Sequence, residues 1–180
     1  MNSFTILGID PGTNTGVSIY TLDNDTFEII DIFSYTIWLN NLINPLGNVR
    51  RDRLFELKNK ILHILQIYQP LVVAYEAPFV NNRFPKSAIY LTEYTTTLCN
   101  TINDFNSDIL IYSYAPKEIK YYIGATGKAD KNDMFNAISN INEITKFINI
   151  KELSEHSIDS LAIGYIMCKE IQEYPTLLLT

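Results

Sequence analysis

Two acidic side chains follow directly on short apolar segments: Asp10 comes after residues 6–9, and Glu76 comes after residues 71–75. Short apolar runs that end near Pro and Gly are typical of buried strands, so each acid is expected at the carboxyl end of a strand. A carboxylate in that position is costly to desolvate unless a hydrogen-bond donor or a cation lies close to it. Taken singly, each acid is more simply explained as a turn-capping residue.

A second polar pair, His156 and Asp159, lies in a segment with helical periodicity at 155–173. Because of their spacing, the two side chains share one face of the first helical turn. A lone helical histidine is more often packed or solvent-facing than a ligand. If this turn packs at the carboxyl end of the sheet, however, it meets Asp10 and Glu76. Three crowded carboxylates need a counter-charge, which Mg²⁺ or Mn²⁺ supplies. Two such ions roughly 4 Å apart can hydrolyse a phosphodiester.

The remaining segments indicate the fold that would bring these side chains together. Strands are predicted in an antiparallel meander at 6–9, 16–22 and 27–36, and again at 71–75 and 109–112. Helices are predicted at 50–68, over about twenty residues from 86, at 117–123, after a capping Asp130, and at 155–173. This order predicts an α/β fold with a five-stranded mixed sheet, three strands antiparallel and two parallel, flanked by helices on both faces. Residues 140–153 show no clear pattern.

Composition limits the class of protein. A chain of 180 residues with 47% hydrophobic residues can bury one sizeable core, so residues 1–180 are expected to form a single domain. The cysteines Cys99 and Cys168 lie in apolar surroundings and are expected to be buried free thiols in a reducing compartment. The sequence shows no charged-then-apolar leader and no apolar run of roughly 20 residues, so we expect a soluble, intracellular protein without membrane association.

The net charge of −6 argues against a nucleic-acid partner, because affinity for DNA comes mainly from Lys and Arg that neutralise phosphates. Local distribution matters more than the sum. Basic residues cluster before the helix at 50–68 and again in a later segment, at Arg50, Arg51 and Arg53 and at Lys117, Lys120, Lys128 and Lys131. Two bound divalent ions would also change the total from −6 to −2.

Five segments together resemble the RuvC family of Holliday junction resolvases. They are ILGIDPGTNTG at 6–16, YEAPF at 75–79, YAPKEIK at 114–120, GKADK at 127–131 and HSIDSLA at 156–162. Each motif alone is weak, but five in this order cover nearly the whole chain. The resemblance implies a ribonuclease H-like fold, a homodimer, and Mg²⁺- or Mn²⁺-dependent nicking of two opposed strands of a four-way DNA junction.

The resemblance also implies roles for the four polar residues. Asp10 matches the family's first-strand aspartate, which bridges both metal ions, and Glu76 matches its second acid. Asp159 matches the acid of the last helix. His156 falls where many relatives have aspartate and some have histidine, so it is predicted as a metal ligand or as a base that titrates near neutral pH. All four are expected to be catalytic.

Further positions match residues with which the family contacts DNA. Phe79 falls where an aromatic side chain stacks on bases at the junction centre, a contact worth on the order of 1–3 kcal/mol. Lys120 and Lys131 match basic residues near the scissile phosphate, and Lys117 and Lys128 are grouped with them as DNA contacts. Without the resemblance, Phe79 would more simply be a core residue and the lysines a solvated helix start.

Other functions are excluded or left open by particular residues. Residues 124–128 are too short for a P-loop, so no nucleotide cofactor is expected. An actin-like ATPase, which residues 10–13 resemble, needs a second large domain, and a proofreading exonuclease needs an acid where Gly12 stands. A related nuclease for forks, flaps or RNA and a non-catalytic junction-binding protein remain open. Gly12 and Gly16 are expected to keep the space over Asp10 free. The expected location is the cytoplasm of a bacterial cell or a phage-infected host.

Overall fold

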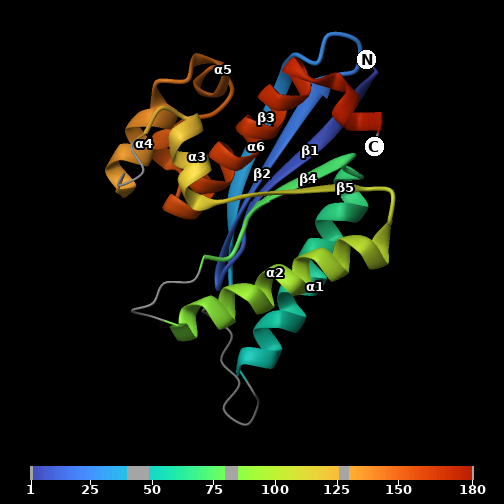
Figure 1. Ribbon diagram of the computed structural model, residues 1–180, viewed down its shortest axis with the longest axis vertical. Helices are drawn as coiled ribbons and strands as arrows, with labels where there is room; N and C mark the ends of the chain where they lie inside the picture. The colour runs from blue at the N-terminus through green and yellow to red at the C-terminus, as the bar shows by residue number, and fades with distance from the viewer. Residues whose placement is uncertain (1, 40–48, 80–84, 126–129, 180) are drawn as a thin grey trace.

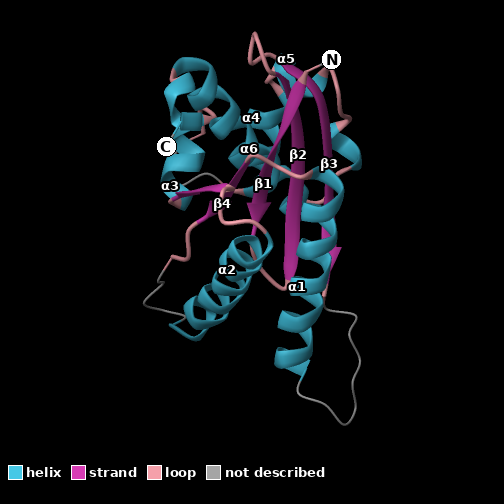
Figure 2. Ribbon diagram, turned by 90° about the vertical axis from the view of Figure 1, so that its right-hand side faces the viewer, coloured by secondary structure: helices cyan, strands magenta, loops and turns pink. Residues whose placement is uncertain are grey.

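The computed structural model describes residues 2–39, 49–79, 85–125 and 130–179 (Figure 1). Its centre is a five-stranded sheet with the strand order β3-β2-β1-β4-β5. Helices pack on both faces of this sheet, with α6 and the small helices on one side and α1 and α2 on the other (Figures 1 and 2). The predicted α/β architecture is therefore confirmed.

The first three strands form the predicted antiparallel meander: β1 (Ser3–Asp10), β2 (Asn14–Asp23) and β3 (Ile29–Trp38). The pairing of β1 with β2 runs from Ser3 opposite Asp23 to Asp10 opposite Gly16. Every residue of β2 from Thr15 to Tyr20 is buried, because helices cover both of its faces. β1 and β2 extend beyond the predicted 6–9 and 16–22 at both ends, whereas β3 begins and ends two residues later than the predicted 27–36.

Two parallel strands extend the other side of β1. They are β4 (Val72–Glu76), which pairs with β1, and β5 (Leu110–Tyr114), which pairs with β4. Parallel neighbours need long crossovers, and α1 (Val49–Tyr68) and α2 (Pro85–Phe105) provide them. The three antiparallel and two parallel strands match the prediction.

The two faces bury separate hydrophobic clusters. One joins the sheet to α1 and α2 through aliphatic side chains that include Leu57, Ile61 and Leu98. The other joins the sheet to α6 (Glu155–Glu173), whose bounds were predicted correctly. Of the residues predicted to face inward from α6, Ile158, Leu161, Ala162 and Ile166 are buried, whereas Tyr165 is half-buried and donates a hydrogen bond to Glu143.

Short helices complete the α6 face. They are α3 (Pro116–Tyr122), α4 (Lys131–Ser139), α5 (Asn142–Thr145) and the 3₁₀ segments η1 (Ile150–Glu152) and η2 (Pro175–Leu179). Asp130 caps α4 as predicted, since its side chain accepts hydrogen bonds from the backbone of Asn132 and Asp133. The unassigned stretch 140–153 forms α5 and η1, each too short for a periodic pattern and each anchored by one buried isoleucine, Ile144 and Ile150.

Two expectations from composition can be compared with the structure. Both cysteines are free, but only Cys168 is fully buried, whereas Cys99 on α2 is half-buried. In the part of the chain that the structure describes, no helix combines the length and apolarity needed to span a membrane.

Candidate active site

Asp10 and Glu76 lie at the same edge of the sheet. Asp10 is the last residue of β1 and Glu76 is the last residue of β4. These strands are parallel neighbours in which Ile9 pairs with Tyr75, so the acids that follow this pair emerge side by side. The prediction that each acid ends a buried strand is confirmed, and the parallel pairing explains why residues far apart in sequence meet here.

The first turn of α6 approaches the same edge so closely that glycine is required opposite it. A β-carbon added to Gly16 would lie 1.9 Å from the carbonyl oxygen of His156, and one added to Gly8 would lie 2.5 Å from the backbone of Ser160 and Gly164. The expectation that Gly16 leaves open space over Asp10 is wrong, because the α6 backbone occupies that space. Since Gly16 pairs with Asp10 across the ladder, this contact sets His156 beside Asp10.

Hydroxyl groups of the sheet hold the α6 backbone in register. Ser18 Oγ donates to the carbonyl oxygen of Ser160 (2.7 Å), and Tyr20 donates to that of Leu161 (2.7 Å). Ser34 on β3 donates to the carbonyl oxygen of Ser157 (3.1 Å). The buried hydroxyls are thereby satisfied, and the helix cannot slide along the sheet without breaking all three bonds.

His156 and Asp10 form the direct contact of the site. His156 Nδ1 lies 2.9 Å from Asp10 Oδ2, with side chains 26% and 17% exposed respectively. The ring of Trp38, at the end of β3, meets the imidazole edge-to-face with centroids 6.5 Å apart. Hydrogen bonding to Asp10 raises the pKa of His156, which opposes the effect of its partial burial.

The three carboxyl groups are held in a state that disfavours negative charge. Burial raises the pKa of Asp10, although the hydrogen bond from His156 acts against it. Burial, together with repulsion from Asp10 and Asp159, raises the pKa of Glu76 to about 8. Burial and repulsion from Asp10 raise the pKa of Asp159 to about 7. Asp159 therefore joins the two strand-end acids, as predicted, and the neighbouring positive charges do not cancel the effect of burial and repulsion on Glu76 and Asp159.

The cluster fits a divalent cation by its chemistry but not by its present arrangement. Within 2–39, 49–79, 85–125 and 130–179, no group of three His, Cys, Asp or Glu side chains is placed so that it could hold a metal ion. Asp10 instead faces His156. Mutually repelling carboxylates are nevertheless the hard oxygen donors that Mg²⁺ and Mn²⁺ prefer. Binding would require the Asp10 side chain to rotate or to be shared with His156.

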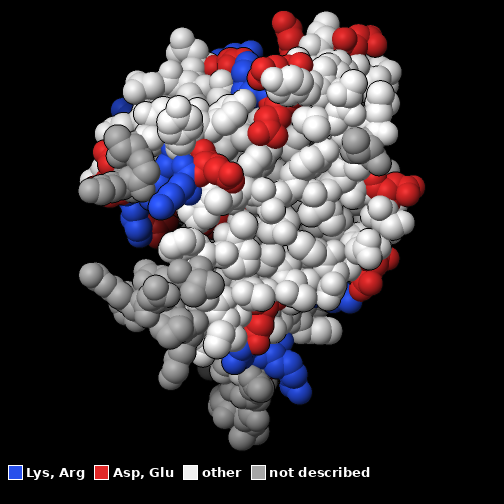
Figure 3. All heavy atoms as spheres, in the orientation of Figure 1, with Lys and Arg blue, Asp and Glu red and all other residues white. Residues whose placement is uncertain are grey.

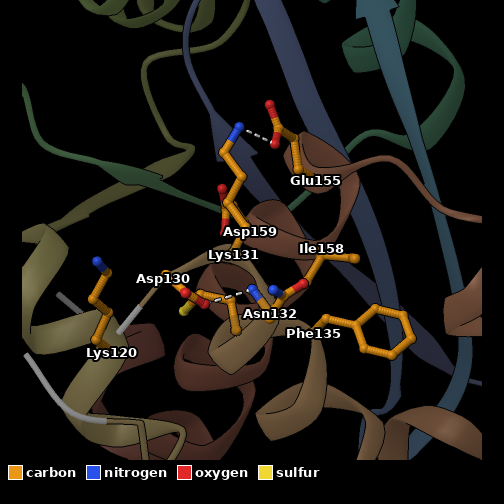
Figure 4. A pocket seen from close by; sticks show the side chains of 9 residues that line it. Lys120, Asp130, Lys131, Asn132, Phe135, Glu155, Ile158 and Asp159 are labelled. Atoms are coloured by element: carbon orange, nitrogen blue, oxygen red, sulfur yellow. Dashed lines mark hydrogen bonds and ion pairs between the residues drawn. The ribbon is translucent and has the colours of Figure 1, made fainter. Parts of the chain in front are cut away.

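A cavity of about 390 Å³ opens beside Asp159, between α3, α4 and α6. Figure 4 shows Lys131 directed toward Glu155 at the start of α6, with Asp159 further along the same helix and Lys120 on α3. The positive charge of Lys120 lowers the pKa values of both Glu76 and Asp159. Lys120 therefore lies near these two acids, and its predicted contact with the scissile phosphate stays a prediction, while Lys131 forms an ion pair with Glu155.

Phe79 and Lys117, two of the remaining predicted DNA contacts, do not line this cavity. Phe79 is 57% exposed, so the alternative that it is a core residue is wrong. Lys117 is exposed on α3 and is not among the residues that line the cavity. Lys128 lies outside the described residues. Figure 3 shows basic side chains gathered near α3 and α4 and again at the lower end of the molecule, where α1 begins.

Two residues near the site were not anticipated. Glu155 contacts Lys131 and lies with its Oε1 3.7 Å from His156 Nε2, and Trp38 packs on the His156 ring. The role of Glu155 could have been predicted from its position directly before His156. The role of Trp38 could not, because its contact with His156 depends on the pairing of β3 with the rest of the sheet.

Comparison with known proteins identifies the family. A family model described as "Crossover junction endodeoxyribonuclease RuvC" matches residues 6–166. The RuvC protein of Caldicellulosiruptor saccharolyticus is 31% identical over 147 residues, covering 78% of this chain and 82% of that protein. The RuvC protein of Caldanaerobacter subterraneus is 27% identical over 167 residues, covering 91% of each.

Solved structures show the same fold. The Thermus thermophilus RuvC structure aligns with a TM-score of 0.70 at 18% identity, covering 94% of this chain and 96% of that one. The yeast mitochondrial Holliday junction resolvase aligns with a TM-score of 0.61 at 15% identity, covering 99% of this chain and 81% of that one. The expected ribonuclease H-like sheet is thus the fold of these proteins. On the family match and the sequence relatives, the chain belongs to the RuvC family of crossover junction endodeoxyribonucleases.

Proposed function

We propose that this protein is a metal-dependent, structure-specific DNA endonuclease that resolves four-way (Holliday) junctions by paired symmetric nicks. The observation that carries the proposal is the convergence of Asp10, Glu76 and Asp159: burial raises the pKa of all three, and repulsion from Asp10 raises the pKa of Glu76 and Asp159 further. The bacterial relatives are named crossover junction endodeoxyribonucleases, and T. thermophilus RuvC has been solved in complex with Holliday junction substrate; both support the choice of substrate.

The site residues divide the work of phosphodiester hydrolysis. Two Mg²⁺ or Mn²⁺ ions, when bound, supply the Lewis acid that activates water and stabilises charge on the phosphate. Asp10, Glu76 and Asp159 hold the ions through carboxylate oxygens. The Asp10 contact orients the His156 ring through Nδ1, so its Nε2 is the atom that serves as a ligand or carries a proton.

Basic and aromatic residues beside the acids bind the DNA. Lys120, which acts electrostatically on Glu76 and Asp159, is placed to offset charge on the scissile phosphate. Lys131 contacts DNA after exchanging Glu155 for a phosphate, and Lys117 and Lys128 add further contacts. The exposed ring of Phe79 stacks on an unpaired base at the junction centre.

The substrate's symmetry requires two active sites. A four-way junction has near two-fold symmetry, and two matched nicks need two sites related by the same operator, so the active form is a homodimer. Residues 1–180 act as one nuclease domain in each protomer. The place of action is the cytoplasm of a bacterial cell or a phage-infected host, where branched DNA arises during recombination.

A junction-cleavage assay with Asp10→Asn tests this proposal. The wild type with Mg²⁺ or Mn²⁺ is expected to nick a synthetic four-way junction at two symmetric positions. Asp10→Asn is expected to lower the rate by about 10³-fold or more, because it removes a carboxylate that would hold the ions. Asp31→Asn removes an exposed aspartate of β3 and serves as the matched control with an unchanged rate.

The same assay separates the alternatives. Preferential cutting of forks, flaps or RNA would replace the junction as substrate, and junction binding by the wild type without any cutting would make the protein non-catalytic. Metal-dependent nicking that survives Asp10→Asn would show that the site is assigned to the wrong residues.

A further inference from the structure

The three arginines at the start of α1 differ in their partners. Arg50 donates two hydrogen bonds to Glu93 and lies over the Tyr90 ring, 4.6 Å from its centroid. Arg51 is exposed and contacts the neighbouring Asp52. Arg53 Nε is the one buried side-chain nitrogen or oxygen without a hydrogen-bond partner among the residues that the structure describes. Of the three, Arg53 is therefore the one with an unmet need for an acceptor.

Arg53 lines a pocket at the start of α1 and α2. The pocket has a volume of about 420 Å³ and is lined by Thr13, Val49, Arg50, Arg53, Tyr90 and Tyr94. Contacts between the lining residues hold its walls in place: Arg50 lies over the Tyr90 ring, and the Tyr94 hydroxyl lies 3.2 Å from the Thr13 hydroxyl. The lining residues combine guanidinium and hydroxyl donors and contain no carboxylate.

We infer that this pocket, which we name the Arg53 pocket, binds a phosphate of the DNA backbone. A phosphate offers the charged oxygen acceptors that a guanidinium fork and hydroxyl donors recognise. The inference rests on the proposed function and deepens it. Thr13 lies in the loop that leads from Asp10 into β2, so the pocket adjoins the active site but lies on the α1–α2 face. It holds the DNA strand at a distance from the cleaved phosphate and orients it for cutting.

The test measures junction binding in EDTA, where metal-dependent cleavage is prevented. Arg53→Gln is compared with Arg51→Gln, which removes the same charge from the same helix but does not line the pocket. Affinity for a fluorescent four-way junction is measured by anisotropy over a range of NaCl concentrations. Arg53→Gln is expected to weaken binding about tenfold and to reduce the slope of log K against log [NaCl] by about one, as loss of a phosphate contact does. Arg51→Gln is expected to change affinity less than about twofold.

A second experiment identifies which phosphate the pocket contacts, and a second variant tests the pocket independently of Arg53→Gln. Junctions carrying a single neutral methylphosphonate at successive positions are bound by wild type and by Arg53→Gln. At the position that the pocket contacts, the wild type loses affinity and the effect of Arg53→Gln disappears. Tyr90→Phe, which keeps the ring over Arg50 but removes the hydroxyl, is expected to weaken binding two- to threefold. If thermal unfolding shows that Arg53→Gln does not fold, Tyr90→Phe is the variant that tests whether the pocket binds DNA.

Three results would overturn the inference. The first is an equal effect of Arg53→Gln and Arg51→Gln on junction affinity. The second is a loss of junction affinity in Arg53→Gln with an unchanged salt slope. The third is an Arg53→Gln variant that binds the junction normally and has lost only the stabilisation of the protein by inorganic phosphate, which would make the pocket a free-phosphate site. Each is distinct from failure of the proposed function, which is shown by wild-type protein that does not nick junctions when Mg²⁺ or Mn²⁺ is restored.

Discussion

The two faces of the sheet are packed by different kinds of contact. On the α1–α2 face, aliphatic side chains such as Leu57 and Ile61 fill the space between helices and sheet. On the α6 face, the helix backbone lies against glycines, and sheet hydroxyls donate to its carbonyl oxygens. Aliphatic packing tolerates small displacements with repacking, whereas hydrogen bonds to a closely seated backbone do not.

This difference fits the role that we propose for α6. In that proposal His156 and Asp159 must reach Asp10 and Glu76 within the short distances that metal coordination and proton transfer require. A helix held by backbone contacts at Gly16 and by hydroxyl bonds at its first two turns keeps those side chains in one place. The α1–α2 face adds a second hydrophobic cluster and, at its end, the Arg53 pocket.

The largest expected contrast is between acids on the two faces. Asp159→Asn is expected to lower junction cleavage by about 10³-fold, because it removes a carboxyl group with a pKa of about 7 that we propose as a metal ligand. Asp104→Asn removes an exposed acid of α2 and is expected to leave the rate unchanged. Single-turnover cleavage at saturating Mg²⁺ measures both. Comparable losses in the two variants would mean that net charge, and not the α6 site, controls the reaction.

The close approach of α6 is tested by glycine substitutions. Gly16→Ala is expected to destabilise the protein by about 3 kcal/mol or more, because the new β-carbon would lie 1.9 Å from the His156 carbonyl oxygen. Gly12→Ala is the matched control, since the nearest atom to its β-carbon is 3.3 Å away, at the backbone of Asn14. Urea unfolding measures both variants, and equal stabilities would disprove the role assigned to Gly16.

Activity distinguishes a displaced helix from a weakened core. Ile61→Ala on the other face is also expected to destabilise, by about 2–5 kcal/mol, because it opens a cavity in the α1–α2 cluster. At a temperature where both variants are folded, Ile61→Ala should cut junctions at the wild-type rate, whereas Gly16→Ala should not. A wild-type rate for folded Gly16→Ala would show that α6 can shift without harm.

The pH dependence of stability follows from the raised pKa values. Glu76 takes up its proton more readily when folded, with a pKa of about 8 against an ordinary 4.5. Stability from this group is therefore complete below about pH 4.5 and is lost as the pH rises through 8. The raised pKa of His156 acts in the same direction. In EDTA we expect a loss on the order of 2 kcal/mol between pH 5.5 and pH 8.

Glu76→Gln isolates the contribution of the carboxylate. This variant is expected to flatten the stability profile, leaving the smaller slope from Asp159 and His156. Mg²⁺ is expected to stabilise the wild type more at pH 8 than at pH 5.5, because the ion competes with protons for the same oxygens. A wild-type profile in EDTA that is flat over this range would contradict the repulsion argued for the cluster.

The fold and the acids could be predicted from the sequence better than the packing and side-chain contacts around those acids. Asp10 and Glu76 were found because an acid after a buried strand is visible in hydropathy, and Asp159 because its helix has clear periodicity. The packing role of Gly16 was missed, since a glycine shows that room is needed but not whether a helix fills it. The Trp38 contact depends on strand pairing. Arg50 contacts Glu93 while Arg53 lines the pocket, and this difference depends on the position of α2, which the local sequence does not reveal.

The smallest contrast concerns a single hydroxyl between sheet and helix. Ser18→Ala removes the donor to the carbonyl oxygens of Ser160 at 2.7 Å and of Gly8 at 3.3 Å. The expected loss is about 1 kcal/mol, the usual net contribution of a buried hydrogen bond. Ile64→Val on α1 deletes a buried methyl group and is expected to cost a similar amount.

These two variants should nevertheless differ in cleavage. Ser18→Ala loosens the register of α6 and is expected to lower the cleavage rate several-fold, whereas Ile64→Val leaves the acids in place and should cut at the wild-type rate. Because the two are matched in stability, a difference in rate reports positioning alone. Equal rates would mean that the glycine contacts suffice to place His156 and Asp159, and that the hydroxyl bonds serve only to satisfy buried polar groups.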